Sequence, residues 1–242
     1  MNSPQTCLEI RGLDVHHGQL RAVTDLSLTV AERQVVAVIG ANGAGKSTLL
    51  RCVAGILPAS RGEILLDGVD VTRLPTHRRV ALGIASVPEG RRLFGSLTVE
   101  ENLRTGAYRH RAGPWDLAAV TELFPWMADR RRQRSSQLSG GEQQAVAICR
   151  ALMSNPRVLL LDELSLGLAP VVVTRMYEAL PRILESGCAV LLVEQDVSKA
   201  LAMTDQVHCL LEGRTVLSGA PADLDRKSVE AAYFGIDRRE AG

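Results

Sequence analysis

The sequence predicts an α/β protein built around a sheet of mostly parallel strands. Three mainly apolar runs, at 34–40, 155–163 and 188–194, have the composition of strands that are covered on both faces. Segments with helical periodicity separate these runs, and a glycine-rich segment at 40–47 joins the first run directly to a helical pattern. Strands that alternate with helices are typical of a parallel sheet with helices on its faces.

The first third of the chain is expected to hold short strands joined by turns. Apolar and polar residues alternate over 8–17 and 25–30, and the buried-type strand at 34–40 follows. A helical pattern at 48–57 comes next, and then a strand at 62–68 that ends in an Asp-Gly turn. The segment 78–90 is expected to supply one further strand and then a loop.

The middle third is predicted to be a helical insertion. Thr98 can cap a helix because Glu101 stands three residues later, and helical periodicity continues over 115–127. A glycine pair at 140–141 precedes a longer helical pattern. The remainder of the chain predicts a helix near 170–186, a strand at 188–194, a short helix, strands at 207–213 and 215–219, and a terminal helix from Pro221.

Composition and charge exclude several classes of protein. The 242 residues are 46% apolar and 23% charged, as in a folded domain and unlike a disordered, collagen-like or coiled-coil chain. Lysine and arginine number 28 against 27 aspartates and glutamates, so a net charge of +1 gives no sign of a nucleic-acid partner.

Five widely spaced cysteines without a CxxC pair favour a reducing compartment and argue against a zinc site. Cys52 and Cys149 stand on apolar helical patterns, so we expect them in the core. With neither a signal peptide nor a long apolar run, the chain is expected in the cytoplasm, reaching a membrane only through a partner.

Residues 40–47, GANGAGKS, satisfy the pattern G-x-x-x-x-G-K-[ST] in full, with a predicted strand before it and a predicted helix after it. Glycines let backbone N–H groups turn toward phosphate oxygens, and the following helix points its positive end at the same anion. Lys46, one of three lysines in the chain, is expected to reach the β- and γ-phosphates, and Ser47 to supply a hydroxyl to Mg²⁺. We assign to nucleotide binding the residues Gly40, Ala41, Asn42, Gly43, Ala44, Gly45, Lys46, Ser47 and Thr48.

An acidic pair ends the strand predicted at 155–163. Because ligands gather at the carboxyl ends of strands in α/β sheets, Asp162 is expected beside the glycine loop, where it would hold Mg²⁺ through water. Glu163, one residue further on, is placed to polarise a water molecule for attack on the γ-phosphate. The two motifs together predict a P-loop nucleotide phosphohydrolase.

A third motif, LSGGEQQ at 138–144, opens the long helical pattern of the middle third. Ser139 and the N–H groups of Gly140 and Gly141 would form a second phosphate-recognition surface at a helix start. One chain would then carry two anion-binding helix starts, which is explained if two chains pair head to tail and each covers the other's nucleotide. The alternative is an ordinary Ser-Gly-Gly helix cap.

The three motifs together resemble the ATP-binding subunit of an ATP-binding cassette (ABC) transporter, over essentially the whole chain. The resemblance implies one ABC ATPase domain over 1–242 with a RecA-like parallel-sheet core, an N-terminal antiparallel β subdomain and an α-helical subdomain. It also implies a core lobe of 1–88 and 157–242 and a helical lobe of 89–156. Four strings, IGANGAGKSTLL, PEGRRLF, SLGLAP and LLVEQD, resemble more narrowly the branched-chain amino-acid importers, and among their two ATPase subunits the smaller, F-type one.

Several positions depart from the pattern common in that family. Glu89 stands where many members have a glutamine that touches Mg²⁺ and the attacking water, and Gln195 stands where most have a histidine at the γ-phosphate. By this correspondence we assign Glu163, Gln195 and Glu89 to catalysis, and Ser47, Asp162 and Glu89 to Mg²⁺. Leu164 and Ala169 replace a usual proline and a usual aspartate.

By the same resemblance, His17, before Gly18, takes the place of the aromatic platform for adenine; the alternative is an exposed loop histidine. The loop with Arg91, Arg92, Leu93 and Phe94 is expected to face a membrane subunit, and the arginines of 130–134 to be a solvated helix end.

The resemblance implies a function and a set of partners. The chain would hydrolyse ATP with Mg²⁺ and drive import, most similarly to branched-chain amino-acid importers, from the cytoplasmic face of the inner membrane. Its partners would be a second ABC ATPase in a head-to-tail heterodimer (a homodimer in isolation), two membrane permeases and, indirectly, an extracytoplasmic solute-binding protein, with no nucleic acid. One alternative is an ATP-dependent clamp that completes its partner's site and hydrolyses weakly. Others are an amide, urea or lipopolysaccharide transporter, or an ABC ATPase for cluster assembly or DNA repair.

Overall fold

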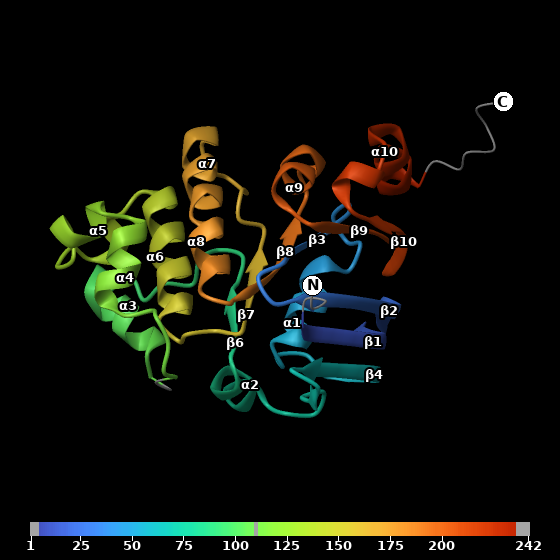
Figure 1. The fold of residues 1–242 in the computed structure, drawn as a ribbon, viewed down its shortest axis with the longest axis horizontal. Helices are drawn as coiled ribbons and strands as arrows, with labels where there is room; N and C mark the ends of the chain where they lie inside the picture. Colours follow the sequence, from blue (N-terminus) through green and yellow to red (C-terminus); the bar gives the residue numbers. More distant parts are fainter. Residues whose placement is uncertain (1–4, 109–110, 236–242) are drawn as a thin grey trace.

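The computed structural model describes residues 5–108 and 111–235, and within these ranges the chain folds around two β-sheets (Figure 1). The central sheet has six strands in the order β10-β9-β3-β8-β7-β6. These strands are β3 (Val35–Ile39), β6 (Ile84–Val87), β7 (Val158–Asp162), β8 (Ala189–Glu194), β9 (Gln206–Leu211) and β10 (Arg214–Gly219). Neighbouring strands are parallel except for β10, which pairs antiparallel with β9. The predicted α/β class is confirmed.

Strands β3, β7 and β8 are buried at every residue, which is why they stand out in the sequence as uninterrupted apolar runs. Because they run parallel, their carboxyl ends lie at one edge of the sheet, where ligands gather in folds of this class. β8 lies between β3 and β7, so the glycine loop and the acidic pair leave the sheet from strands that are next-but-one neighbours.

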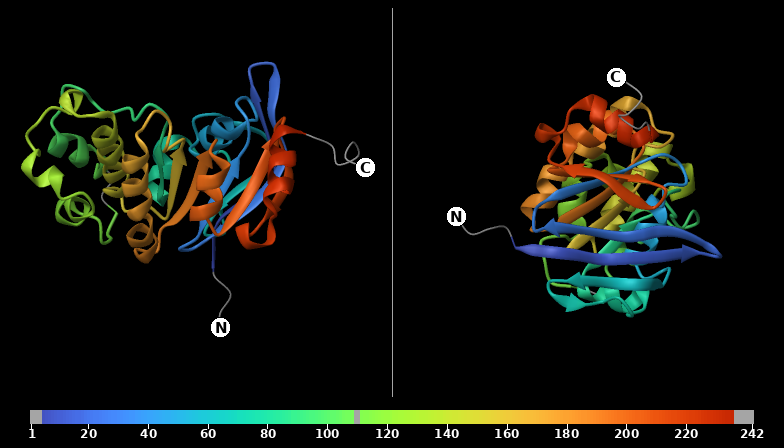
Figure 2. Two further views of the ribbon diagram at one scale, coloured as in Figure 1. Left: turned by 90° about the horizontal axis from the view of Figure 1, so that it is seen from above. Right: turned by 90° about the vertical axis from the view of Figure 1, so that its right-hand side faces the viewer.

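An antiparallel sheet of order β2-β1-β4-β5 lies on the other side of helix α1 (Lys46–Val53) (Figures 1 and 2). Its strands are β1 (Thr6–His17), β2 (Leu20–Ala31), β4 (Ala59–Leu66) and β5 (Val69–Asp70). Leu49, Cys52 and Val53 of α1 belong to one apolar cluster that takes residues from both sheets, so α1 fixes one sheet on the other. The turn between β4 and β5 places Asp67 and Gly68 at φ of 48° and 78°, as the Asp-Gly signal predicted.

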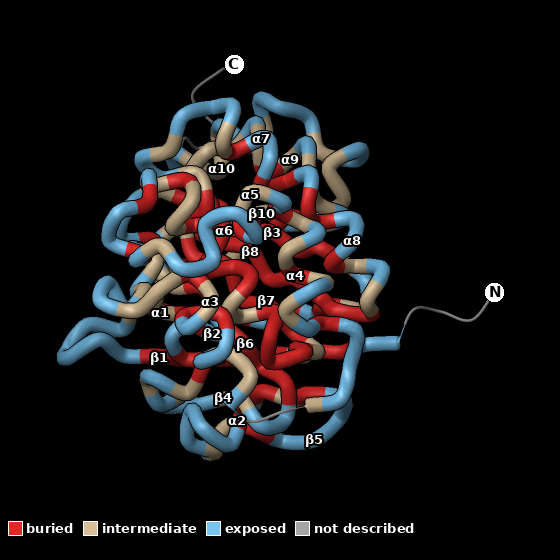
Figure 3. The backbone as a smooth tube through the Cα atoms, turned by 90° about the vertical axis from the view of Figure 1, so that its left-hand side faces the viewer, coloured by how far each residue is buried: buried red, intermediate tan, exposed pale blue. Residues whose placement is uncertain are grey.

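The middle third forms the helices at the end of the molecule away from the antiparallel sheet (Figure 1). They are α3 (Val99–Gly106), α4 (Leu117–Leu123), α5 (Trp126–Asp129) and α6 (Gly140–Leu152). The predicted cap is confirmed, because Thr98 and Glu101 form a reciprocal capping box at the start of α3. Apolar residues of these helices share a continuous core with β7 and β8, and the buried positions in Figure 3 run through the middle of the molecule. The exact division into two lobes stays a prediction.

The helices of the last third cover the parallel sheet. They are α7 (Pro170–Glu178), α8 (Leu180–Glu185), α9 (Val197–Met203) and α10 (Arg226–Phe234). The helix expected near 170–186 is present as two segments, since Pro181 at the start of α8 lacks the N–H that would continue the ladder of α7. The terminal helix expected from Pro221 opens as a 3₁₀ turn, and α10 itself begins after Asp225, whose side chain accepts from Ser228 N.

Helix α2 (Thr76–Leu82) corrects the expectation that 78–90 holds only a strand and a loop. The strand is β6, but a helix precedes it, and buried Arg79 explains why. The Arg79 guanidinium donates to the carbonyls of Cys52 and Val53 at the end of α1, and to those of Thr72 and Leu74. A charged residue thus occupies the buried position of α2, where an apolar residue would have indicated a helix in the sequence.

All five cysteines are buried free thiols, so the predicted core positions of Cys52 and Cys149 are confirmed. No helix in the two described ranges combines the length and the apolar character needed to cross a bilayer.

Candidate functional site

The glycine loop connects β3 to α1 in a conformation that two of its glycines make possible. Gly45 has φ of 101°, and a Cβ there would lie 2.2 Å from the Ala22 carbonyl oxygen. A Cβ on Gly40 would lie 2.4 Å from the Leu210 carbonyl oxygen. Because backbone of β2 and β9 closes on the loop at these points, any larger residue would displace it. The antiparallel sheet and β9 therefore hold the loop in shape.

Lys46 is the first residue of α1, and only 4% of it is exposed. Its Nζ donates to the carbonyl oxygens of Gly40 at 2.8 Å and Ala41 at 3.1 Å. Burial lowers the pKa of the Lys46 ammonium, and the negative charges of Glu163, Asp162 and Glu194 oppose that effect. The ammonium is therefore held in the loop by weak neutral acceptors, which a phosphate group can replace with a stronger charge-assisted partner.

Ser47 and Asp162 come together although 115 positions separate them in the sequence. Ser47 Oγ donates to Asp162 Oδ1 at 3.0 Å, with Asp162 buried at the last position of β7. Burial raises the pKa of Asp162, the hydrogen bond from Ser47 lowers it, and the charges of Glu163 and Glu89 raise it further.

The donor set at this point suits Mg²⁺. A hydroxyl and a carboxylate offer the hard oxygens that the ion prefers, and Mg²⁺ commonly takes few protein ligands together with substrate phosphates and water. No group of three or more His, Cys, Asp or Glu side chains in the described ranges is arranged to hold a metal by itself. The residues therefore fit a metal bound jointly with phosphate.

Glu163 is the first residue after β7 and lies in the left-handed region, with φ of 51°. Its Oε1 accepts from Gln195 Nε2 at 2.8 Å and lies 3.9 Å from Lys46 Nζ. Gln195 Nε2 also donates to Asn42 Oδ1 at 2.7 Å, so one amide group joins the glycine loop to the acidic pair. The structure thus brings Gln195, Glu163 and the loop into direct contact.

These groups open into one cavity of about 430 Å³. Its lining residues are His17, Leu20, Ala22, Asn42, Gly43, Gly45, Lys46, Ser47, Thr48, Glu89, Glu163, Leu166 and Gln195. The lining gathers His17 and Glu89 with the loop, where the resemblance to ABC ATPases places them, and their roles stay predictions. Sequence reasoning missed Leu20, Ala22 and Leu166. The apolar residue just after the His17–Gly18 turn was the available signal for Leu20, which leaves 70% of its surface exposed.

Ser139, Gly140 and Gly141 lie elsewhere. Ser139 caps α6 through a reciprocal capping box with Glu142, so the segment is a helix start, as predicted. Ser139 and Gly141 line a separate hollow bounded by α4, α5 and α7, and not the cavity of the glycine loop. A Cβ on Gly141 would lie 2.3 Å from Val172 Cγ1, so α7 packs directly on this glycine. Within one chain, the structure does not bring the two helix starts to one cavity.

A strand leads through a glycine loop into a helix, and a serine hydroxyl of that helix is bonded to an aspartate at the end of the next-but-one strand. This arrangement defines a P-loop nucleotide-binding protein. The family model described as ABC transporter matches residues 23–165. The chain therefore belongs to the ABC transporter ATP-binding family, whose cassettes hydrolyse ATP.

Two characterised relatives extend the match over nearly the whole chain. The high-affinity branched-chain amino acid transport ATP-binding protein BraG of Pseudomonas aeruginosa is 42% identical, over 92% of this chain and 97% of its own. The lipopolysaccharide export system ATP-binding protein LptB of Escherichia coli K12 is 33% identical, over 90% and 93%.

A solved structure, an ATP-binding subunit of an ABC transporter, superposes with a TM-score of 0.79 at 28% identity, over 95% of this chain and 98% of that one. The expected ABC ATPase fold is confirmed, and the chain is an ATP-binding subunit of an ABC transporter.

Proposed function

We propose that this chain hydrolyses ATP to drive the import of branched-chain amino acids through separate membrane permeases. The similarity to BraG supports the substrate class. The position of Glu89, which lines both the nucleotide cavity and a second groove, supports coupling to another subunit and is the structural observation on which the proposal rests.

The geometry suggests a role for each polar group around the cavity. Lys46 and the loop amides bind the phosphates, and His17 offers a ring surface to adenine at the mouth of the cavity. Ser47, Asp162 and Glu89 would hold Mg²⁺, which would neutralise phosphate charge. Glu163 accepts the proton of the attacking water, and Gln195 orients Glu163 through its amide. On ATP binding, the amide N–H that bonds to Asn42 would turn to a γ-phosphate oxygen.

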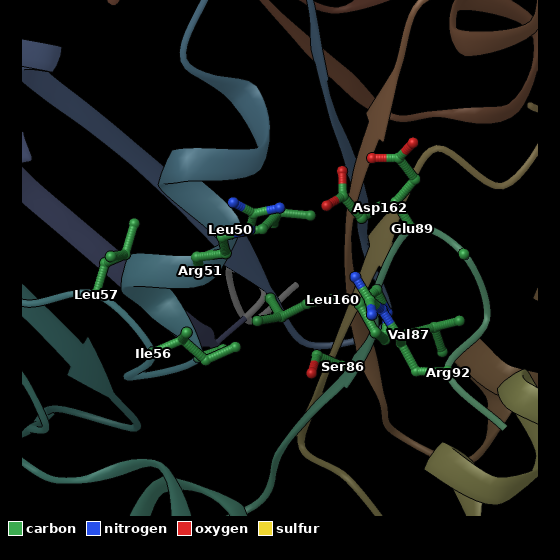
Figure 4. Close-up of a pocket in the computed structure, with 13 residues that line it drawn as sticks. Leu50, Arg51, Ile56, Leu57, Ser86, Val87, Glu89, Arg92, Leu160 and Asp162 are labelled. Atoms are coloured by element: carbon green, nitrogen blue, oxygen red, sulfur yellow. The ribbon is translucent and has the colours of Figure 1, made fainter. Parts of the chain in front are cut away.

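The second groove has a volume of about 640 Å³ and lies between α1 and the loop after β6 (Figure 4). Leu50, Arg51, Ile56 and Leu57 line its α1 side, and Ser86, Val87, Glu89 and Arg92 line the other side. Apolar and cationic side chains in a concave surface suit a helical segment of another protein. We assign this groove to a permease, which places the chain at the cytoplasmic face of the inner membrane.

The loop of this groove is anchored to α6, the helix that begins at Ser139. Arg150 of α6 donates to the carbonyl oxygens of Arg92 at 2.8 Å and Arg91 at 3.3 Å, and its guanidinium lies over the ring of Phe94. Arg91 and Arg92 both have positive φ, 65° and 47°, so the loop adopts a strained shape that these contacts maintain. Movement in the groove would therefore reach α6 and the Ser139 segment.

A head-to-tail pair of cassettes accounts for the position of the Ser139 segment. This helix start presents a capping serine and two glycines but lies apart from the glycine-loop cavity of its own chain. Placed over a partner's cavity, Ser139, Gly140 and Gly141 would complete a closed nucleotide site. The partner is a second ABC ATPase, or a second copy of this chain in isolation.

Transport in proteoliposomes tests the proposal. The chain would be reconstituted with the permeases and the second ATPase of its transporter, and ATP-dependent movement of leucine, isoleucine and valine would be measured. Ile56→Glu places a charge in the groove outside the catalytic groups, so it should abolish transport while the isolated chain still hydrolyses ATP. Transport of the amino acids without any dependence on this chain's Glu163 would refute the assignment.

Two other functions have specific support. The similarity to LptB favours lipopolysaccharide export, which the same proteoliposomes would reveal as movement of a lipid-linked glycan instead of amino acids.

The bond from Gln195 to Glu163 favours a clamp that binds ATP and hydrolyses poorly, since it occupies one oxygen of the base. Single-turnover ATPase of the two-cassette complex, with each chain's glutamate replaced in turn, separates the clamp from the main proposal.

A further inference from the structure

Glu194 is a buried carboxylate that none of the assigned roles uses. It is the last residue of β8, it precedes Gln195, and only 1% of it is exposed. Its Oε1 accepts from Tyr177 Oη at 2.9 Å and from Ser165 N at 3.1 Å, and its Oε2 accepts from Ser165 Oγ at 2.9 Å. A carboxylate so deeply buried is costly unless its lone pairs are satisfied, and here three donors from two other segments satisfy them.

The donors come from segments that lead to other parts of the proposed machinery. Ser165 stands two residues after Glu163, so Glu194 fixes the backbone that leaves the catalytic base. Tyr177 is a buried residue of α7, whose first turn carries Val172. Val172 is the side chain that packs against Gly141 at the start of α6. Helix α7 therefore contacts Glu194, the residue before Gln195, through Tyr177, and it contacts Gly141 of the Ser139 segment through Val172.

The geometry points to Glu194 and Tyr177 as positioning residues that tie α7, and through Val172 the Ser139–Gly141 segment, to Gln195. This inference rests on the proposed function, because it takes Gln195 as the group facing the γ-phosphate and the Ser139 segment as part of the partner's site. A shift of Gln195 on nucleotide binding would move Glu194, and the hydrogen bond to Tyr177 would transmit that shift to α7. The nucleotide bound to one chain would thereby shift the Ser139–Gly141 segment of that chain, which covers the nucleotide of the partner.

Tyr177→Phe is the most direct variant, since it removes one hydroxyl and keeps the ring. Tyr108→Phe, at an exposed position after α3, is the matched control. We expect kcat for ATP to fall about tenfold in Tyr177→Phe with KM nearly unchanged, the size of effect given by the loss of one hydrogen bond to a charged group. The kcat of Glu194→Ala should be lower still. Glu194→Gln keeps an acceptor for Ser165 N, so its kcat should lie between those of Glu194→Ala and wild-type. Adding Tyr177→Phe to Glu194→Ala should cost little more, because both remove the same bond.

Mixed dimers test the transmission itself. A chain carrying Glu163→Gln and Tyr177→Phe is mixed with wild-type chain. In a dimer of one variant chain and one wild-type chain, only the site with the wild-type Glu163 turns over. The Ser139 segment that covers this site belongs to the Tyr177→Phe chain. Turnover of that site should drop relative to a mixture with Glu163→Gln alone. Unchanged turnover would overturn the inference, because a merely local role of Tyr177 cannot reach the partner's site.

A positive control separates this inference from the proposed function. A chain carrying Glu163→Gln and Ser139→Ala must slow the wild-type site in the same mixture; if it does not, the head-to-tail proposal fails. The link from Gln195 through Glu194 and Tyr177 to α7 is then tested by hydrogen exchange within one chain. In Glu163→Gln, ATP should protect 163–172 as well as the loop at 40–48, and Tyr177→Phe should remove the first protection and keep the second. Equal protection of 163–172 with and without Tyr177→Phe would refute this link.

Discussion

The side-chain amide of Gln195 donates to Glu163 Oε1 at 2.8 Å and to Asn42 Oδ1 at 2.7 Å. Both hydrogens of the amide nitrogen are thus used by protein groups, one on the glycine loop and one on the residue assigned as the base. Glutamine carries no titratable proton, so this link keeps the same charge across physiological pH. The orientation of the base is therefore independent of the protonation state of its partner.

Gln195→His should make hydrolysis depend on pH. An imidazole titrates near pH 6.5, so the variant should show an inflection in kcat between about pH 5.5 and 7.5 that wild-type lacks. We expect kcat to fall on the acid side, because the protonated ring would hold the Glu163 carboxylate as an ion pair and withdraw it from water. The measurement is kcat against pH at saturating ATP and fixed ionic strength. Superimposable profiles would mean that residue 195 does not reach the reacting groups.

Glu163→Gln should bind ATP and fail to hydrolyse it. The amide preserves the shape of the side chain but cannot accept the proton of water, so kcat should fall by about 10²-fold or more. Size-exclusion chromatography with ATP and Mg²⁺ should then show a stable closed dimer. Glu122→Gln, which changes an exposed carboxylate of α4, is the control. Wild-type turnover by the Glu163 variant would place the base elsewhere.

Lys46→Ala should abolish hydrolysis and weaken nucleotide binding while the fold persists. The ammonium donates hydrogen bonds to the carbonyls of Gly40 and Ala41 and lies 3.9 Å from Glu163 Oε1, and the substitution leaves the backbone of the glycine loop unchanged. Loss of a preorganised positive charge at the phosphates should lower kcat by about 10²-fold or more. Calorimetry would follow binding, and circular dichroism would confirm folding. Lys199→Ala, on α9, serves as the comparison, and equal loss in both variants would contradict the specific role of Lys46.

Sequence patterns predicted the parts of the site that are local in the chain. The glycine loop lies between its strand and its helix as expected, because that geometry is set within a dozen residues. The meeting of Ser47 with Asp162 was also predicted, since both residues follow carboxyl ends of parallel strands. The roles of these residues in hydrolysis remain predictions.

The features that were not predicted depend on contacts without a periodic signal. Arg79 is a charged residue in a buried position, where backbone carbonyls at the end of α1 and at Thr72 and Leu74 accept its hydrogen bonds. Glu194 read as one more residue of an apolar strand, and its partners Ser165 and Tyr177 lie 29 and 17 positions away. Such pairings follow from the order β3-β8-β7, which no local pattern in the sequence specifies.

His208 of β9 is 5% exposed, and its two ring nitrogens lack a hydrogen-bond partner within the described residues. Burial lowers its pKa, so the unfolded chain binds a proton at higher pH than the folded chain does. The free energy of unfolding is therefore unaffected by His208 above about pH 6.5 and decreases as the pH falls below that value. The decrease reaches about 1.4 kcal/mol for each unit by which the pKa of the folded chain lies below that of the unfolded chain. His208→Leu, which keeps an apolar side chain of similar volume in the strand, should unfold at higher urea than wild-type at pH 5.5, with a smaller gain at pH 7.5. His77→Gln, at an exposed position of α2, is the control variant. An equal shift of the His208 variant at both pH values would show that the buried ring stays out of the acid titration of the fold.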